Sequence, residues 1–281
     1  MAEKLIIATT MAEAASLKNS DSAFLAGGTE INRLGTSVAA ATVVSIGRIE
    51  DLDGISIIED QTPACSQSGC SKEGKILRIG AMCTFQDVVE SDLVPAYLKE
   101  ACRFMASRTK RNMATIGGNV ALKRDDSYLY PTLLAAGAKL QMLDRDGNTV
   151  YKCAKRYLES GDLYRDNLIV AILLPLDAGV VCSKRIANTA QSHAALTVSV
   201  GCKDGKVRLS AAIKNTALVY MAELSEKLCA RDMDDKEILD AVCANKSLVF
   251  ENDIFGSPEY KRYLLSVIIS DLAKQAKGGK R

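Results

Sequence analysis

The sequence predicts a mixed protein of the α+β class, because the pattern of helices and strands changes along the chain. Residues 5–46 alternate short apolar runs with helical segments, as in parallel strand pairing. From about Asp51 the apolar runs are separated by turns instead, and the chain ends in three helical segments. With 281 residues, the chain is long enough for one large domain or two to three smaller ones.

The first part is predicted to contain strands at residues 5–7, 23–26 and 43–46. A helix is expected over 10–17, where Thr10 and Glu13 have capping-box spacing. A further helix is expected to begin directly after Gly27-Gly28.

The middle part is predicted to contain β segments at 54–59, 75–80, 139–143 and 167–174, with a hairpin turn at Asp146-Gly147. Helices are expected over 84–90, 94–107 and 129–136, and residues 108–126 are expected to form one long loop. Residues 175–179 resemble a linker. Beyond it we expect a hairpin of strands 196–202 and 207–213, then helices over 218–231, 235–245 and 258–277.

Composition excludes several classes of protein. The chain has 36 Lys and Arg residues against 34 Asp and Glu residues, so its net charge of +2 provides no basic surface for a nucleic-acid partner. No apolar run approaches the roughly 20 residues that span a bilayer, so no membrane association is expected. The first residues lack the pattern of a signal peptide, and a cytoplasmic protein is expected.

The single histidine, His193, limits the chemistry that side chains alone can perform. Histidine is the side chain that titrates near neutral pH, so the chain has little acid–base apparatus of its own. A bound cofactor is therefore expected to carry any reaction, and His193 is expected to be structural or on the surface.

The nine cysteines contain no C-x-x-C pair, and their odd number argues against a disulfide framework. Most are expected to be small buried hydrophobic residues. Cys65 and Cys70 lie in a polar loop. They either bind a metal or form a redox pair, or they are simply part of an insertion. No metal ligands are assigned.

Two glycine pairs are the main candidate site. The first lies in Phe24-Leu25-Ala26-Gly27-Gly28-Thr29-Glu30-Ile31, where a strand leads into two glycines and then a helix. Backbone N–H groups can approach an anion there without an intervening Cβ, although a plain turn has the same pattern.

The second pair lies in Thr115-Ile116-Gly117-Gly118-Asn119, after the cations Arg108, Lys110 and Arg111, which are either phosphate ligands or a solvated charge run. Together the two loops are suited to an extended ligand with a pyrophosphate, a dinucleotide such as FAD.

The paired loops, in this order and at this separation, resemble the FAD-binding (medium) subunit of molybdenum hydroxylases, the flavoprotein family of xanthine dehydrogenase and carbon monoxide dehydrogenase. The resemblance continues through Pro131-Thr132-Leu133-Leu134-Ala135, Asp146-Gly147, Lys184-Arg185-Ile186 and residues 256–262, and so covers essentially the whole chain. It implies a two-subdomain FAD-binding fold (PCMH-like) over residues 1–176, with subdomains of about 1–52 and 53–176. A smaller α+β C-terminal domain over 177–281 would follow.

The resemblance also implies the residues that bind FAD. They are Phe24, Leu25, Ala26, Gly27, Gly28, Thr29, Glu30, Ile31, Met105, Thr115, Ile116, Gly117, Gly118, Asn119, Ile169 and Lys184. The family usually has an aspartate three residues before Pro131, and this chain has Tyr128 there. Either Asp126 takes over that contact or the contact is lost.

The function implied by the resemblance is electron transfer without a catalytic side chain. A molybdopterin-containing large subunit and a [2Fe-2S] small subunit would supply electrons, and NAD or another acceptor would receive them. Two alternatives remain open: a stand-alone FAD-dependent reductase of a small molecule, and an assembly subunit with weakened FAD binding.

Overall fold

The computed structural model describes residues 3–34, 40–63, 74–189 and 192–278, and these divide into two compact units. The first unit contains the described residues up to Leu122 together with Ala138–Leu176. The second contains Lys123–Gly137 and the described residues from Asp177 onward. The chain therefore enters the second unit, returns to the first and leaves it again, which the sequence did not predict. The domain limits inferred from the sequence stay a prediction.

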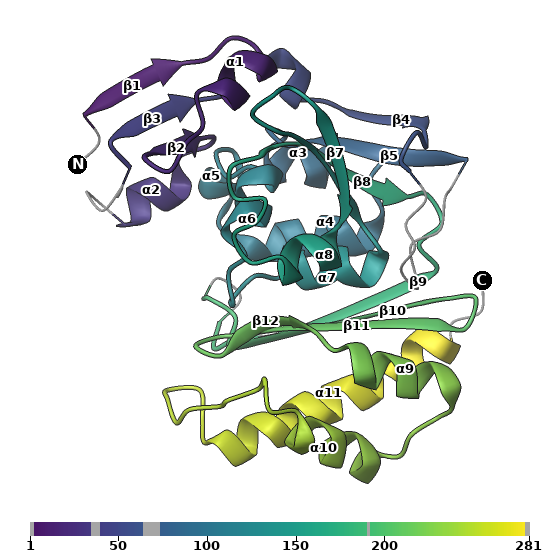
Figure 1. The fold of residues 1–281 in the computed structure, drawn as a ribbon. Helices are drawn as coiled ribbons and strands as arrows, with labels where there is room; N and C mark the ends of the chain where they lie inside the picture. Colours follow the sequence, from purple (N-terminus) through teal and green to yellow (C-terminus); the bar gives the residue numbers. More distant parts are fainter. Residues whose placement is uncertain (1–2, 35–39, 64–73, 190–191, 279–281) are drawn as a thin grey trace. The chain divides into compact units, whose positions relative to one another are not determined.

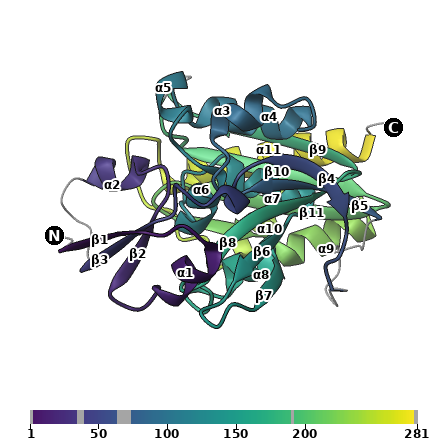
Figure 2. The same ribbon diagram turned by 90° about the horizontal axis from the view of Figure 1, so that it is seen from above.

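The first unit begins with a parallel sheet in the order β1-β3-β2 (Figures 1 and 2). Its strands are β1 (Lys4–Ile7), β2 (Ser22–Leu25) and β3 (Thr42–Ser45), joined through α1 (Met11–Ser16) and α2 (Thr29–Leu34). The side chain of Thr10 caps α1 by accepting a hydrogen bond from the Glu13 amide. The parallel pairing expected from the alternating pattern is confirmed.

A second sheet in the same unit is antiparallel, in the order β4-β5-β8-β6-β7. Its strands are β4 (Ile55–Glu59), β5 (Lys75–Gly80), β6 (Lys139–Leu143), β7 (Thr149–Cys153) and β8 (Leu168–Pro175). The single turn η1 (Glu50–Leu52) and helices α3 (Phe85–Glu90), α4 (Ala96–Met105) and α8 (Ala154–Glu159) complete this region.

One hydrophobic cluster joins the two sheets of the first unit. It contains Ala14 and Ala15 of α1 and Val44 of β3, packed with Leu168 and Val170 of β8. Because β8 is buried along nearly its whole length, its sequence is an unbroken apolar run rather than an alternating one.

The long loop expected over residues 108–126 is wrong, because the segment contains two short helices. They are α5 (Arg108–Arg111) and α6 (Ile116–Leu122). Gly117 and Gly118 lie inside α6, where isolated glycines weaken a helix. Tertiary packing against residues 81–83, which accept hydrogen bonds from the first amides of α6, outweighs that local preference.

The second unit is built on an antiparallel sheet in the order β12-β11-β10-β9. Its strands are β9 (Val180–Ile186), β10 (Leu196–Lys203), β11 (Lys206–Ile213) and β12 (Ala217–Tyr220), and its helices are α7 (Leu129–Ala136), α9 (Ala222–Ala230), α10 (Asp235–Ala244) and α11 (Pro258–Gly278). The helix expected over 218–231 is partly wrong, because its first residues extend the sheet as β12.

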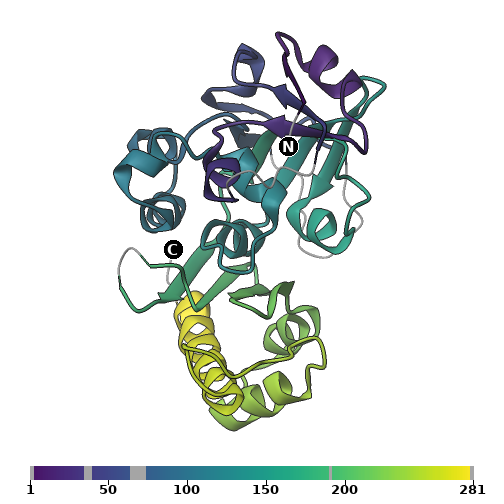
Figure 3. The ribbon, with the colours of Figure 1, turned by 90° about the vertical axis from the view of Figure 1, so that its left-hand side faces the viewer.

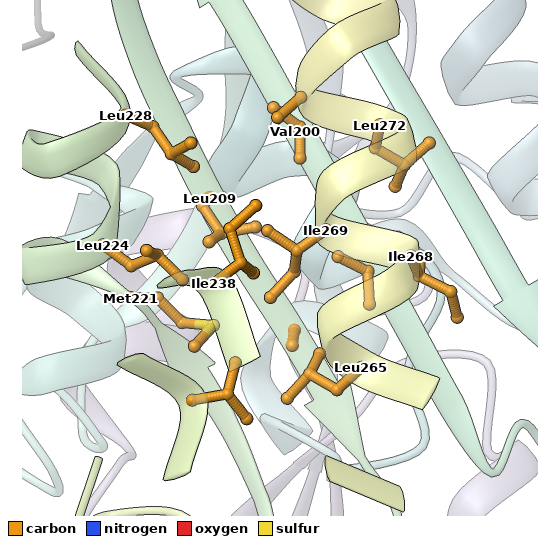
Figure 4. Close-up of a cluster of buried hydrophobic side chains, with 14 of the residues drawn as sticks. Val200, Leu209, Met221, Leu224, Leu228, Ile238, Leu265, Ile268, Ile269 and Leu272 are labelled. Atoms are coloured by element: carbon orange, nitrogen blue, oxygen red, sulfur yellow. The ribbon is translucent and has the colours of Figure 1, made fainter. Parts of the chain in front are cut away.

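Two kinds of side chain alternate along β10 and β11. Val198, Val200 and Leu209 contribute to the core cluster shared with α9, α10 and α11. Figure 4 labels Val200 and Leu209 in this cluster, and Figure 3 shows the helices of this unit in green and yellow. Away from the hairpin turn, the alternate positions carry small or hydroxyl side chains except for Arg208, whose Nε donates to the Ala135 carbonyl of α7 at 2.7 Å. Ser210 Oγ donates to the Pro131 carbonyl at 2.8 Å, and Ser199 Oγ lies 3.4 Å from Thr132 Oγ1. The sheet is therefore covered on both faces, by an apolar layer on one side and a hydroxyl-bearing layer on the other.

Among the helices formed by described residues, none has both the length and the apolar character needed to cross a bilayer.

Candidate functional site

The first glycine loop follows β2 and ends where α2 begins at Thr29. Phe24 and Ala26 pack against the hydrophobic cluster of the first unit, so these two residues anchor the loop. Gly28 has a φ of 70°, a left-handed conformation that favours glycine. Within the described part of the chain, the backbone amides of Gly27 and Gly28 have no hydrogen-bond acceptor. The loop therefore has two N–H donors available for a ligand.

The two glycine loops lie against each other although they are far apart in sequence. A Cβ added to Gly27 would stand 1.6 Å from the Met113 carbonyl oxygen, and one added to Gly118 would stand 4.0 Å from Ala26 Cβ. Only glycine at position 27 permits this approach. The two glycine loops are thus close together within the first unit, as a site shared by both would require.

The second loop uses its own amides to hold its shape. Ile116 and Gly117 donate to the carbonyls of Cys83 and Ala81, at 3.0 and 2.9 Å. Gly118 donates to Thr115 Oγ1 at 3.2 Å, so the buried Thr115 caps α6. These three amides are occupied within the protein, and the FAD contacts predicted for residues 115–119 stay a prediction.

Two further predicted contacts belong to the same unit. Ile169 lies on β8 and is buried beside Val170, whose carbonyl accepts the amide of Ala81 at 2.9 Å. Ala81 in turn touches Gly117, where a Cβ would stand 2.6 Å from Ala81 Cβ. Met105 is the last residue of α4 and precedes α5. The structure thus collects the two loops, Ile169 and the end of α4 in one unit.

Of the three cations before the second loop, Arg111 is structural. Its Nε donates to Gln86 Oε1 at 3.0 Å, and its guanidinium also donates to the carbonyls of Arg103 and Ala106. Arg108 is a surface residue whose side chain is 74% exposed and lies 3.7 Å from Glu90. Lys110 is also exposed. The segment therefore combines one structural arginine with two solvated cations.

Asp126 belongs to the second unit and is held by two partners. Arg124 donates to both of its oxygens at 2.7 Å, and His193 Nδ1 lies 2.9 Å from Oδ2. Burial by itself raises the pKa of Asp126, but the Arg124 guanidinium, with His193 and Lys214 nearby, holds that pKa below its ordinary value. Asp126 is therefore an ionised anchor within its own unit. The neighbouring predicted contact, Tyr128, is buried.

Lys184 lies on the face of β9 opposite to α7. Ser183 Oγ lies 3.1 Å from Thr132 Oγ1 of α7, and side chains alternate along a strand, so Arg185 shares the α7 face while Lys184 does not. Lys184 is exposed, and its neighbours Cys182 and Ile186 pack toward the core with α11. The predicted role of Lys184 stays a prediction. Arg185 lies on the α7 face instead, a position that only the register of β9 reveals.

The described cysteines are less uniform than expected. Cys83, Cys102 and Cys153 are buried, whereas Cys229 and Cys243 are exposed. Cys65 and Cys70 lie outside the described residues. Among the residues that are described, no group of three His, Cys, Asp or Glu side chains is arranged to hold a metal ion.

The donors of the first unit fit the FAD expected from the sequence. A pyrophosphate needs N–H donors that it can approach closely, and the Gly27-Gly28 loop has two unused amides on residues without a Cβ. The left-handed Gly28 and the close packing of Gly27 explain why both positions are glycine.

Comparison with known proteins agrees with this geometry. Residues 1–177 match the family described as the FAD binding domain in molybdopterin dehydrogenase. The chain is 30% identical to the uncharacterized protein YgfM of Escherichia coli (strain K12) over 200 residues, covering 70% of this chain and 71% of YgfM. It is 27% identical to aldehyde oxidase 1 of Bos taurus over 173 residues, which is 55% of this chain and 13% of that protein.

Solved structures show the same fold. A chain of quinoline 2-oxidoreductase from Pseudomonas putida 86 superposes with a TM-score of 0.74 at 18% identity, covering 99% of this chain and 98% of the other. A chain of carbon monoxide dehydrogenase from Oligotropha carboxidovorans gives a TM-score of 0.75 at 21% identity, with coverage of 99% and 98%. The predicted α+β class is confirmed, and FAD is the cofactor expected of the matched domain. The chain thus belongs to the family of FAD binding domains in molybdopterin dehydrogenases, the flavoprotein subunits of molybdenum hydroxylases.

Proposed function

We propose that this chain is the FAD-binding electron-transfer subunit of a molybdenum hydroxylase-type dehydrogenase complex, with NAD or another molecule as electron acceptor. Its partners are a molybdopterin-containing large subunit and a [2Fe-2S] small subunit, and the complex is cytoplasmic. The observation that carries the proposal is the packing of Gly27 on Met113, which fixes a glycine loop with two unused amides.

Five residues of the first unit have a role in this proposal. The amides of Gly27 and Gly28 bind the pyrophosphate of FAD, and Thr115 holds the supporting helix in place. Ile169 and Met105 provide apolar contacts, while the predicted contacts of Asp126, Tyr128 and Lys184 depend on the family resemblance alone. When bound, FAD supplies two-electron redox chemistry, and the protein supplies its position and its electrostatic environment.

The proposal is tested by the flavin content of the purified chain. The wild-type protein is expected to carry FAD, or to take up added FAD, with the visible absorbance of an oxidised flavin. A colourless protein that takes up no FAD would contradict the proposal and favour an assembly subunit, for which Tyr128 at the usual aspartate position is the specific observation. A stand-alone reductase would retain FAD but would turn over a small molecule without partner subunits.

Two matched variants test whether the glycine loop is the FAD site. Gly28→Ala and Gly147→Ala both place a Cβ on a glycine with positive φ, 70° and 84°. Both are expected to lower the free energy of unfolding by about 1 kcal/mol. Only Gly28→Ala should weaken FAD binding, because a Cβ at position 28 keeps the phosphate away from the amides. Equal FAD affinity in the two variants would place the cofactor elsewhere.

A further inference from the structure

Four large apolar residues are exposed where the chain enters α11 in the second unit. They lie between the end of α10 and the second turn of α11, and this connection is the yellow-green loop at the lower left of Figure 1. The exposed fractions are 67% for Val249, 85% for Ile254, 52% for Tyr260 and 58% for Tyr263. Single exposed apolar residues are ordinary on protein surfaces, whereas a contiguous group of them marks an interaction site. These four residues are named the α11 surface.

Three of the four residues meet at the start of α11. Gly256 closes the turn that carries Ile254, and its carbonyl accepts a hydrogen bond from the Asp253 amide at 3.3 Å. A Cβ added to Gly256 would stand 2.6 Å from Cδ1 of the Tyr260 ring, so this turn lies against the tyrosine. Tyr263 follows three residues later and shares a face of α11 with Tyr260. Ile254 and the two tyrosines therefore form a continuous surface.

Val249 lies at the edge of the same surface. Its neighbour Phe250 is buried, and the Arg262 guanidinium lies over the Phe250 ring, 5.3 Å from the ring centroid. Because Arg262 directly precedes Tyr263 on α11, this cation–π contact holds the segment with Val249 beside that tyrosine. All four residues thus belong to one patch.

A buried lysine holds the connection in place under this patch. Lys261 Nζ lies 2.6 Å from Asp253 Oδ1 and donates to the Glu251 carbonyl at 2.8 Å. The Phe255 amide donates to the same Asp253 oxygen at 2.9 Å. Ile254 therefore projects from a turn whose two neighbouring residues are fixed by hydrogen bonds. A surface that is already ordered loses little conformational entropy when a partner binds, so this patch is suited to binding.

The charges around the α11 surface are balanced. Within residues 246–263, Asp253 and Lys261 pair with each other. The other charged side chains of this segment are two cations and two carboxylates: Lys246, Arg262, Glu251 and Glu259. A surface without net charge does not select an acidic or a basic partner. In a two-fold contact each copy presents both signs to the other, so a glutamate and an arginine can pair across it.

We propose that the α11 surface is the contact between two copies of this chain, related by a two-fold axis. The four residues expose on the order of 500 Å² of surface, since a half-exposed tyrosine alone provides about 100 Å². Two copies together would then bury about 1,000 Å², the area at which a specific interface becomes stable. Tyrosine is also enriched in interfaces, because its ring is apolar and its hydroxyl can bind a polar group or water. The dimer goes beyond the proposed function and requires neither FAD nor another subunit.

The experiment measures the mass of the purified full chain by sedimentation equilibrium between about 1 and 100 μM. The wild-type mass should rise from that of one chain toward that of two. Ile254→Asp places a charge in the contact and should raise the Kd of the dimer at least about tenfold. Leu163→Asp is the matched control, because Leu163 is a similarly exposed residue of the first unit, at 73%. Both residues are exposed, so both variants should fold normally.

Footprinting with hydroxyl radicals identifies the surface that is covered. Tyr260 and Tyr263 should be labelled about twofold less at the highest concentration than at the lowest, whereas labelling of Leu163 should not change. In Ile254→Asp, the labelling of both tyrosines should no longer depend on concentration.

Several results would overturn the proposal. A chain that stays monomeric over the whole range does so, and a mass that rises only when another subunit is added would assign the surface to that subunit. A dimer that Ile254→Asp leaves intact, or that Leu163→Asp weakens equally, places the contact elsewhere. Assembly beyond two copies contradicts the two-fold axis. None of these results depends on flavin content, so a colourless chain would contradict the proposed function and leave the dimer in place.

Discussion

The backbone of Gly27 lies directly against the main-chain carbonyl of Met113, and this contact joins the two glycine loops. A Cβ at position 27 would stand 1.6 Å from that oxygen and 2.7 Å from the carbonyl carbon. Both obstacles are backbone atoms, so a side-chain rotation cannot relieve the overlap. The contact explains why residues more than eighty positions apart form one surface.

Gly27→Ala should therefore destabilise the protein strongly. To make room for the added Cβ, the backbone of one loop must move away from the other. This movement should lower the free energy of unfolding by about 3 kcal/mol, measured by urea denaturation. Gly47→Ala is the matched control, because no atom lies within 4 Å of the added Cβ and its φ is not positive. The control should change stability by less than about 1 kcal/mol. Equal stability of the two variants would mean that the loops separate without cost.

A buried ion pair at the start of β6 provides a second test. Lys139 Nζ lies 3.3 Å from Asp60 Oδ2 and donates to Thr62 Oγ1 at 2.7 Å, and the Asp60 side chain is fully buried. Lys139→Met removes a cation and a hydrogen-bond donor from a buried site, so the free energy of unfolding should fall by about 3 kcal/mol. The exposed pair of Arg231 and Glu237 is the control, and Arg231→Gln should cost less than about 1 kcal/mol. Urea denaturation measures both variants. Similar losses in free energy of unfolding would contradict the burial of the Lys139–Asp60 pair.

The ion contacts of Asp126 make part of the stability depend on pH. The pKa of this carboxyl is lowered on folding, so its contribution is fully present above the ordinary aspartate value of about 4 and is lost as pH falls through the lower folded value. Asp126→Asn should cost about 2 kcal/mol at neutral pH. The gap between the urea midpoints of variant and wild type should narrow below about pH 4. A gap that widens in acid would reverse the assigned direction.

The sequence is sufficient to predict helix starts and tight turns, because neighbouring residues determine them. Thr84 and Asp87 form a capping box at the start of α3, the helix expected over 84–90. Asp204 and Gly205 have positive φ values of 49° and 74°, as the tight turn between β10 and β11 requires. Both features depend on neighbouring residues alone, so a single sequence is sufficient to identify them.

Features that depend on distant packing could not be predicted in this way. The helix α6 contains two glycines and exists because its first amides bond to residues 81 and 83. The grouping of α7 with the second unit depends on contacts such as that of Gly201, where a Cβ would stand 2.0 Å from the Ala135 carbonyl oxygen. The orientation of Lys184 away from α7 follows from the register of β9, which the residues of β9 alone do not reveal.

The cysteines should differ in reactivity in the folded chain. Burial and the neighbouring Asp53 carboxylate raise the pKa of Cys83 to about 12, and burial also raises the pKa of Cys102. Since the thiolate is the reactive form, these two should resist alkylation until the protein unfolds. Cys243 is exposed and should react in the native state. Mass spectrometry after a short iodoacetamide pulse, with and without denaturant, measures the difference at each site. Because Cys83 lies in the connection between β5 and α3 and Cys102 lies on α4, early labelling of either in native protein would show that its segment opens locally.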